Sequence, residues 1–108
     1  MKAKEMFEKE GFKQTYFNND KDSQEIAIRY EKIIPLVSVR EITFICYKNR
    51  KYDSNGIILN SVYFQGDLRF YNQETSKYEV VCGLVINTTL LNAINKQVEE
   101  LKQEMVKW

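Results

Sequence analysis

The longest amphipathic pattern in the chain runs from Thr88 to Trp108. Its apolar residues recur at alternating steps of four and three, which places all of them on one side of a helix. These residues are Ile94, Val98, Leu101, Met105 and Trp108. The pattern predicts a long C-terminal helix that buries one face, and Asn87 or Thr88 is expected to cap its start.

A shorter helical pattern covers Lys2 to Glu10, and Gly11 follows it as the left-handed residue that commonly ends a helix. Between the two helices, apolar and polar residues mostly alternate, which is typical of strands with one buried face. Pro35, the only proline, marks a connection or a strand edge. The expected strands are 12–17, 24–32, 36–47, 57–64, 68–71 and 78–86, with turns at Asn18-Asn19-Asp20, Asn55-Gly56, Gly66-Asp67 and Asn72 to Lys77.

Two of these segments have unusual patterns. Val37 and Val39 have the opposite parity to Ile42, which requires either a bulge near Arg40-Glu41 or two separate short strands. Segment 78–86 is apolar on both faces, and this pattern predicts a central strand of the sheet.

Together the patterns predict one α+β domain that spans residues 1–108. We expect a twisted antiparallel sheet of five to seven strands. A short N-terminal helix precedes it, and the long C-terminal helix packs on one face.

The charge balance narrows the range of partners. Lys and Arg number 16 against 15 Asp and Glu, so the chain lacks the basic excess that a duplex-DNA-binding protein usually has. No segment approaches the roughly 18 apolar residues of a membrane span, and the N-terminus does not resemble a signal peptide. A cytoplasmic protein without membrane contact is therefore expected.

The residue types also narrow the chemistry. The chain has no histidine, which removes the commonest general base and most zinc sites. Cys46 and Cys82 lie in apolar strand-like segments and are predicted to be buried free thiols. The acid pairs Asp20/Asp22 and Glu99/Glu100 leave a carboxylate-only enzyme formally open, but solvated surface charge is the preferred interpretation. We predict a non-enzymatic protein without catalytic residues, metal or cofactor.

Two binding hypotheses remain. In the first, the far end of the C-terminal helix contacts a protein partner or a second copy of the chain, because an apolar helix end is a common contact element. Its predicted contact residues are Leu101, Met105 and Trp108. In the alternative, a basic loop with a tyrosine binds single-stranded nucleic acid weakly. That set consists of Arg40, Lys48, Arg50, Lys51 and Tyr52.

Three stretches resemble a group of small proteins encoded by phages and prophages of low-GC Gram-positive bacteria. The stretches are Met6-Phe7-Glu8-Lys9 with Gly11-Phe12, then Ile28-x-Tyr30 with Ile42-Thr43-Phe44, and Ala93-Ile94-x-Lys96-Gln97-x-Glu99-Glu100-Leu101. The chain departs from the group at Leu90 and Leu91, where relatives often carry acids, and in continuing past Leu101 to Trp108. The resemblance implies a mobile-element accessory protein in the cytoplasm of a bacterial host, and it transfers no functional residue.

Overall fold

The computed structural model describes residues 1–20, 22–47, 55 and 61–105. Several predictions fall outside these residues. They are the basic loop 48–52, the first part of the strand expected at 57–64, the Asn55-Gly56 turn as a whole, and the helix end at 106–108.

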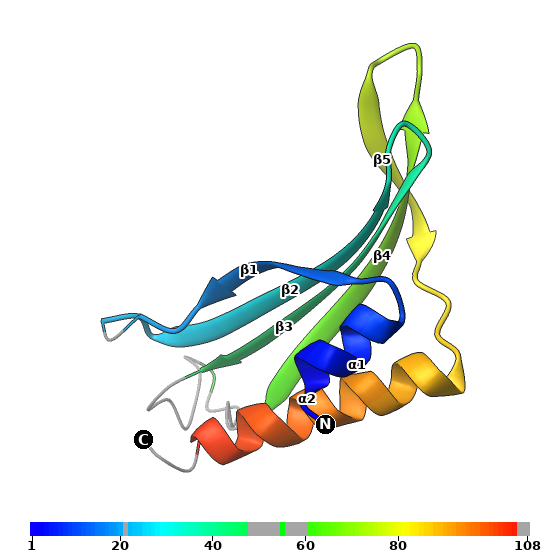
Figure 1. Ribbon diagram of the computed structural model, residues 1–108. Coiled ribbons are helices and arrows are strands. Elements are labelled where there is room, and N and C mark those ends of the chain that lie inside the picture. Colours follow the sequence, from blue (N-terminus) through cyan, green and yellow to red (C-terminus); the bar gives the residue numbers. More distant parts are fainter. Residues whose placement is uncertain (21, 48–54, 56–60, 106–108) are drawn as a thin grey trace.

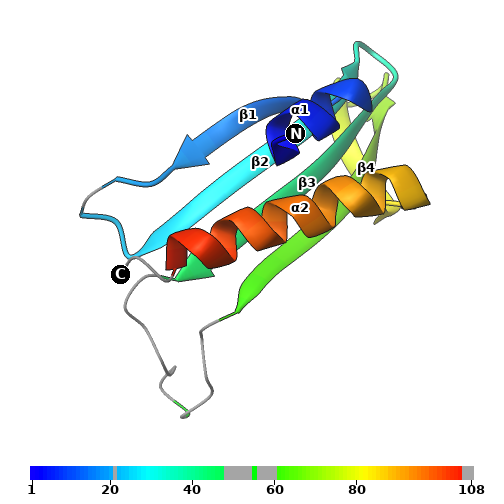
Figure 2. The same cartoon turned by 60° about the horizontal axis from the view of Figure 1, so that its bottom comes forward.

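The described chain forms a five-stranded antiparallel sheet with two helices on one of its faces (Figures 1 and 2). The strands follow one another across the sheet in chain order, so every neighbouring pair in the sheet is also consecutive in the chain. The elements are α1 (Ala3–Lys9), β1 (Lys13–Asn18), β2 (Glu25–Ile34), β3 (Ser38–Tyr47), β4 (Val62–Asn72), β5 (Lys77–Gly83) and α2 (Thr88–Met105). The predicted α+β class, sheet and helix placement are confirmed.

Alternate residues of the central strands build the core. Because side chains alternate between the two faces of a strand, Ile26, Ile28 and Tyr30 of β2 share the face that the helices cover. The register places them opposite Cys46, Phe44 and Ile42 of β3, which are also buried. The helices complete the core with Phe7, Leu90, Ala93, Ile94 and Leu101.

Tyr30 joins the sheet to both helices. Its ring stacks on Phe7 of α1 with a centroid distance of 4.0 Å and an interplanar angle of 12°. Its hydroxyl donates a hydrogen bond of 2.6 Å to Oε1 of Gln97 on α2, and both side chains are buried. Burial raises the pKa of Tyr30 above its ordinary value, and the carboxylates of Glu100 and Glu8 raise it further.

The ends of the helices follow the predicted local rules. Oδ1 of Asn87 accepts a hydrogen bond of 2.8 Å from the backbone N–H of Leu90, so Asn87 caps α2. Gly11 has a φ of +86°, which confirms its left-handed conformation after α1.

The irregularity predicted near Arg40-Glu41 is wrong. β3 is one continuous strand whose register with β2 runs without a shift from Tyr47 to Ser38. The parity changes because Val39 is buried on the face away from the helices, in the same row as Ile33 and Arg69. The apolar residues change face while the strand stays regular.

The turn predicted at Gly66-Asp67 is also wrong, because β4 passes through both residues. Gly66 is explained by a close approach. Its backbone carbonyl accepts a hydrogen bond of 3.2 Å from the N–H of Leu84, and a Cβ at position 66 would lie 2.9 Å from the Cβ of Leu84. The turn predicted between Asn72 and Lys77 is confirmed.

The third correction concerns β5, which lies at the edge of the sheet and not in its centre. Val80 and Val81 of this strand are 62% and 59% exposed. Cys82 is exposed as well, whereas Cys46 is buried, so the predicted burial of the free thiols is right for Cys46 and wrong for Cys82. Apolar residues on both faces of β5 therefore have no cover within the described chain.

Candidate interaction surface

Exposed apolar side chains gather at the end of the sheet that the helices do not reach. Figure 1 shows the β2–β3 turn and the β4–β5 hairpin projecting away from both helices. The exposed residues there are Ile33, Ile34, Leu36, Val37, Phe70, Val80 and Val81, which we call the distal apolar surface. Scattered exposed apolar residues are normal in proteins, but a group drawn from adjoining elements indicates an interaction site.

The tip of this surface is a strained turn. Pro35 and Leu36 occupy its central positions, and the N–H of Val37 donates a hydrogen bond of 3.0 Å to the carbonyl of Ile34. Leu36 has a φ of +59°, a conformation that glycine or asparagine adopts far more readily than leucine. Its side chain is 67% exposed. Strain of this kind concentrates at functional sites, so Leu36 marks the tip as a candidate contact.

The tip is held in place by its neighbours. The N–H of Leu36 donates a hydrogen bond of 2.9 Å to the hydroxyl of Tyr78 on β5. The N–H of Tyr71 donates another of 2.9 Å to the carbonyl of Val37, and the rings of Tyr71 and Tyr78 lie 5.2 Å apart. These contacts tie the β2–β3 turn to β4 and β5, so the apolar residues are presented in a fixed arrangement.

The two edges of the sheet differ in character. β1 is a six-residue strand rich in polar residues, and its pairing with β2 shifts register between Gln14 and Tyr16. A short, polar, irregular edge of this kind discourages pairing with another chain. β5 also contains a register shift, opposite Leu68 and Arg69, but it carries exposed valines. The adjacent exposed valines of β5 are typical of a strand that another strand covers, whereas the exposed apolar residues of β1 are the aromatics Tyr16 and Phe17.

Nearer the centre, the outer face of the sheet is polar and internally paired. The guanidinium of Arg29 lies 2.9 Å from Glu41, and Arg69 forms ion pairs with Glu41 and Glu31. The hydroxyl of Thr15 adds a hydrogen bond of 2.7 Å to Glu31. Because these charges neutralise one another, this region needs no cover. Tyr16 and Tyr63 are also exposed on this face, but the aliphatic side chains exposed there lie at the distal end.

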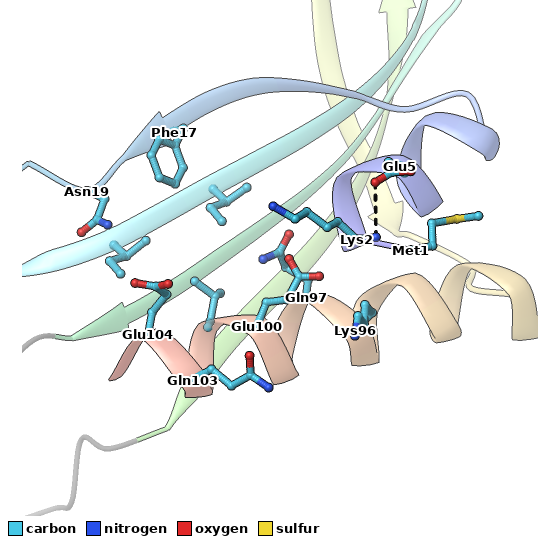
Figure 3. A pocket seen from close by; sticks show the side chains of 13 residues that line it. Met1, Lys2, Glu5, Phe17, Asn19, Lys96, Gln97, Glu100, Gln103 and Glu104 are labelled. Atoms are coloured by element: carbon cyan, nitrogen blue, oxygen red, sulfur yellow. Dashed lines mark hydrogen bonds between the residues drawn. The ribbon is translucent and has the colours of Figure 1, made fainter. Parts of the chain in front are cut away.

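The pocket in Figure 3 has a volume of about 690 Å³ and lies between α1, α2 and the first two strands. Phe17, Ile28 and Leu101 give it apolar walls, while polar side chains of the helices surround it. One of its carboxylates, Glu100, accepts a hydrogen bond of 2.7 Å from the N–H of Ala3 and so holds the start of α1.

The acids considered as catalytic pairs lie in a turn and on the surface of α2. Glu99 lies 3.8 Å from Lys96 on the surface of α2, and the carbonyl of Asp20 accepts a hydrogen bond of 3.0 Å from the N–H of Ser23. Among the described residues, no three His, Cys, Asp or Glu side chains are arranged to hold a metal ion. The non-enzymatic character of the chain stays a prediction.

The predicted partner-binding residues on α2 have different environments. Leu101 is only 3% exposed and belongs to the core, where it holds α2 on the sheet. Met105 is partly buried against the same core, and Trp108 lies outside the described residues. Sequence periodicity identified a buried stripe correctly, but periodicity cannot distinguish the chain's own sheet from a partner.

Arg40 is the member of the predicted nucleic-acid-binding set that the structure describes. It is half-buried in β3 on the helix-covered face, roughly 23 Å along the strand from Tyr47. The other members of the basic set, Lys48, Arg50, Lys51 and Tyr52, lie outside the described residues. Nucleic-acid binding through that set stays a prediction.

Sequence reasoning missed the distal apolar surface. Two signals pointed toward it: apolar residues on both sides of the single proline, and a strand apolar on both faces.

Comparison of the chain with protein-family models, curated proteins and solved structures finds no match. Within the described residues, no helix is long and apolar enough to cross a lipid bilayer.

Proposed function

We propose that this chain is a non-enzymatic protein-interaction module that associates with a second copy of itself by pairing β5 with the partner's β5. The observation that carries the proposal is the exposure of Val80 and Val81 on an edge strand whose pattern is that of a central strand. Pairing supplies the missing neighbour, and backbone hydrogen bonds between the strands supply much of the affinity.

Two features favour a second copy as the partner. The sheet is antiparallel throughout, and two-fold symmetry brings two identical strands together antiparallel. A pair centred on Val80 uses all seven residues of β5 and opposes no like charges, because Lys77 faces the partner's Gly83 and Glu79 faces the partner's Val81.

The neighbouring apolar residues enlarge the contact. A stable interface buries about 1,000 Å² or more in total, which strand pairing alone does not reach. Phe70 of β4 and the β2–β3 turn adjoin β5, so the distal apolar surface of each copy supplies the additional area. The origin implied by the resemblance to phage and prophage proteins stays a separate prediction.

The test is the oligomeric state of the full chain as a function of concentration, measured by light scattering after gel filtration and by sedimentation. We expect a dimer. Val80→Lys should raise its dissociation constant at least tenfold, because a lysine on the edge strand opposes pairing. Val85→Lys is the matched control, since Val85 is 87% exposed but lies outside β5.

Hydrogen exchange locates the contact. Amides of residues 77–83 should exchange more slowly at high protein concentration than at low concentration, and Val80→Lys should abolish the difference. A strict monomer at several hundred micromolar, or a dimer that survives Val80→Lys, would overturn the proposal.

A further inference from the structure

A second pocket lies where the helices stop covering the sheet, and it is lined by charged and apolar residues together. Its volume is about 470 Å³. Its floor consists of three residues that lie side by side on adjacent strands, next to the core. Lys32 of β2 pairs with Arg40 of β3, and Arg40 pairs with Leu68 of β4. Leu84 and Leu90 form apolar walls, and Glu10 lies at the end of α1. A volume of 300–1,000 Å³ with few polar groups is typical of small-molecule sites.

The placement of Lys32 and Arg40 is unfavourable for the isolated chain. Both are half-buried on the face that the helices cover, directly opposite each other on adjacent strands. Like charges in this position destabilise a sheet. No carboxylate of the described residues lies within 4.0 Å of either side chain, although Glu10 lines the same pocket.

The other face of the same sheet provides the contrast. Arg29 and Arg69 also lie within strands, and each forms an ion pair with Glu41. The chain therefore neutralises its strand arginines where they have no pocket beside them. Lys32 and Arg40 do line a pocket, and there the described residues provide no carboxylate partner for them.

We propose that this pocket binds a small organic monoanion, a carboxylate carried on an apolar body. The two cations and the single carboxylate of Glu10 leave one net positive charge, which matches a monoanion better than a dianion. The guanidinium of Arg40 matches a carboxylate in geometry, and Lys32 adds a point charge. Leu68, Leu84 and Leu90 contact the apolar body.

The experiment titrates the full-length protein with octanoate and follows backbone amide shifts by NMR. We expect saturable shifts in Lys32, Arg40 and the segment 84–87. Arg40→Gln and Lys32→Gln should each weaken octanoate binding about tenfold, because each removes a hydrogen bond to a charged group. Lys102→Gln, on the exposed face of α2, should leave the affinity within twofold of the unmodified chain.

Two comparison compounds test the charge. Octanol should bind at least tenfold more weakly than octanoate. Octyl phosphate should also bind more weakly, because the single net positive charge of the site does not offset the larger cost of desolvating a dianion. Equal affinity for octanol and octanoate would overturn the proposal, as would the absence of saturable shifts in the millimolar range.

Stability provides an independent readout. Removing one of two opposed cations should leave the urea midpoint of Arg40→Gln and Lys32→Gln unchanged or raised, which shows that both variants fold. A lowered midpoint in both variants would assign the two cations to the stability of the sheet and contradict the proposal.

Discussion

Tyr30→Phe tests whether the hydrogen bond that crosses the core stabilises the fold. The substitution keeps the ring that stacks on Phe7 at 4.0 Å and removes only the hydroxyl that donates to Gln97. Tyr30 is 1% exposed, so water does not replace the lost donor, and the Gln97 oxygen loses its hydrogen-bond donor inside the protein. Leaving a buried group unsatisfied costs about 1–3 kcal/mol, and we expect the free energy of unfolding to fall by about that amount.

A double-mutant cycle isolates the pairwise contribution. Gln97→Met leaves the Tyr30 hydroxyl without its acceptor, so it should destabilise the protein by a similar amount. The double variant Tyr30→Phe/Gln97→Met replaces both polar groups by apolar ones and should lose less than the sum of the single losses. Urea unfolding followed by circular dichroism measures all four stabilities, and additive losses would refute the coupling between α2 and β2.

The pH dependence gives a second check of the same residue. The pKa of Tyr30 is raised in the folded state, so the unfolded chain loses this proton first, near the ordinary value of about 10. The stabilisation is fully present below that pH and declines above it by about 1.4 kcal/mol per pH unit. The decline between pH 10 and 11 should be shallower in Tyr30→Phe than in the unmodified chain. Equal slopes in the two proteins would contradict the assignment.

Three further outcomes follow from single positions. Gly66→Ala should lower the free energy of unfolding by about 1–2 kcal/mol in urea melts, because its Cβ would lie 2.9 Å from that of Leu84; an unchanged stability would show that Leu84 moves freely. Leu36→Asn should leave the monomer as stable or more stable, since asparagine tolerates a φ of +59°, while sedimentation shows weaker self-association; a stronger dimer would contradict this. A thiol reagent should modify exposed Cys82 quickly and buried Cys46 only on unfolding, and equal rates would refute the assigned burial.

The parts of the fold that were predictable from sequence are those whose pattern depends on one buried face. The helical stripe of Ile94 and Leu101 specified α2, and the alternation of Ile26 and Ile28 specified β2. The wrong predictions concern residues whose conformation depends on a neighbour that is distant in sequence. The sequence around Gly66 predicts a turn because the adjacent residues do not reveal the close approach of Leu84.

The candidate sites were less predictable, because a sequence pattern indicates that a face is buried but does not identify the surface that covers it. Leu101 was assigned to a partner and packs on the chain's own sheet. Arg40 was grouped with a loop by proximity in sequence, whereas strand pairing brings it to Lys32. The position of Arg40 shows that closeness in sequence does not measure closeness in space.

The error at β5 has a different meaning, and it links the pattern to the proposed dimer. A strand apolar on both faces predicts neighbours on both sides, yet in the single chain β5 has β4 alone. The helix-covered end of the sheet follows the pattern because α1, α2 and the strands bury one another. At the distal end, pairing with a second β5 would give Val80 and Val81 the central position that their sequence predicts. The rule would then hold for the proposed dimer, and the place where it fails in the single chain is where we propose the interface.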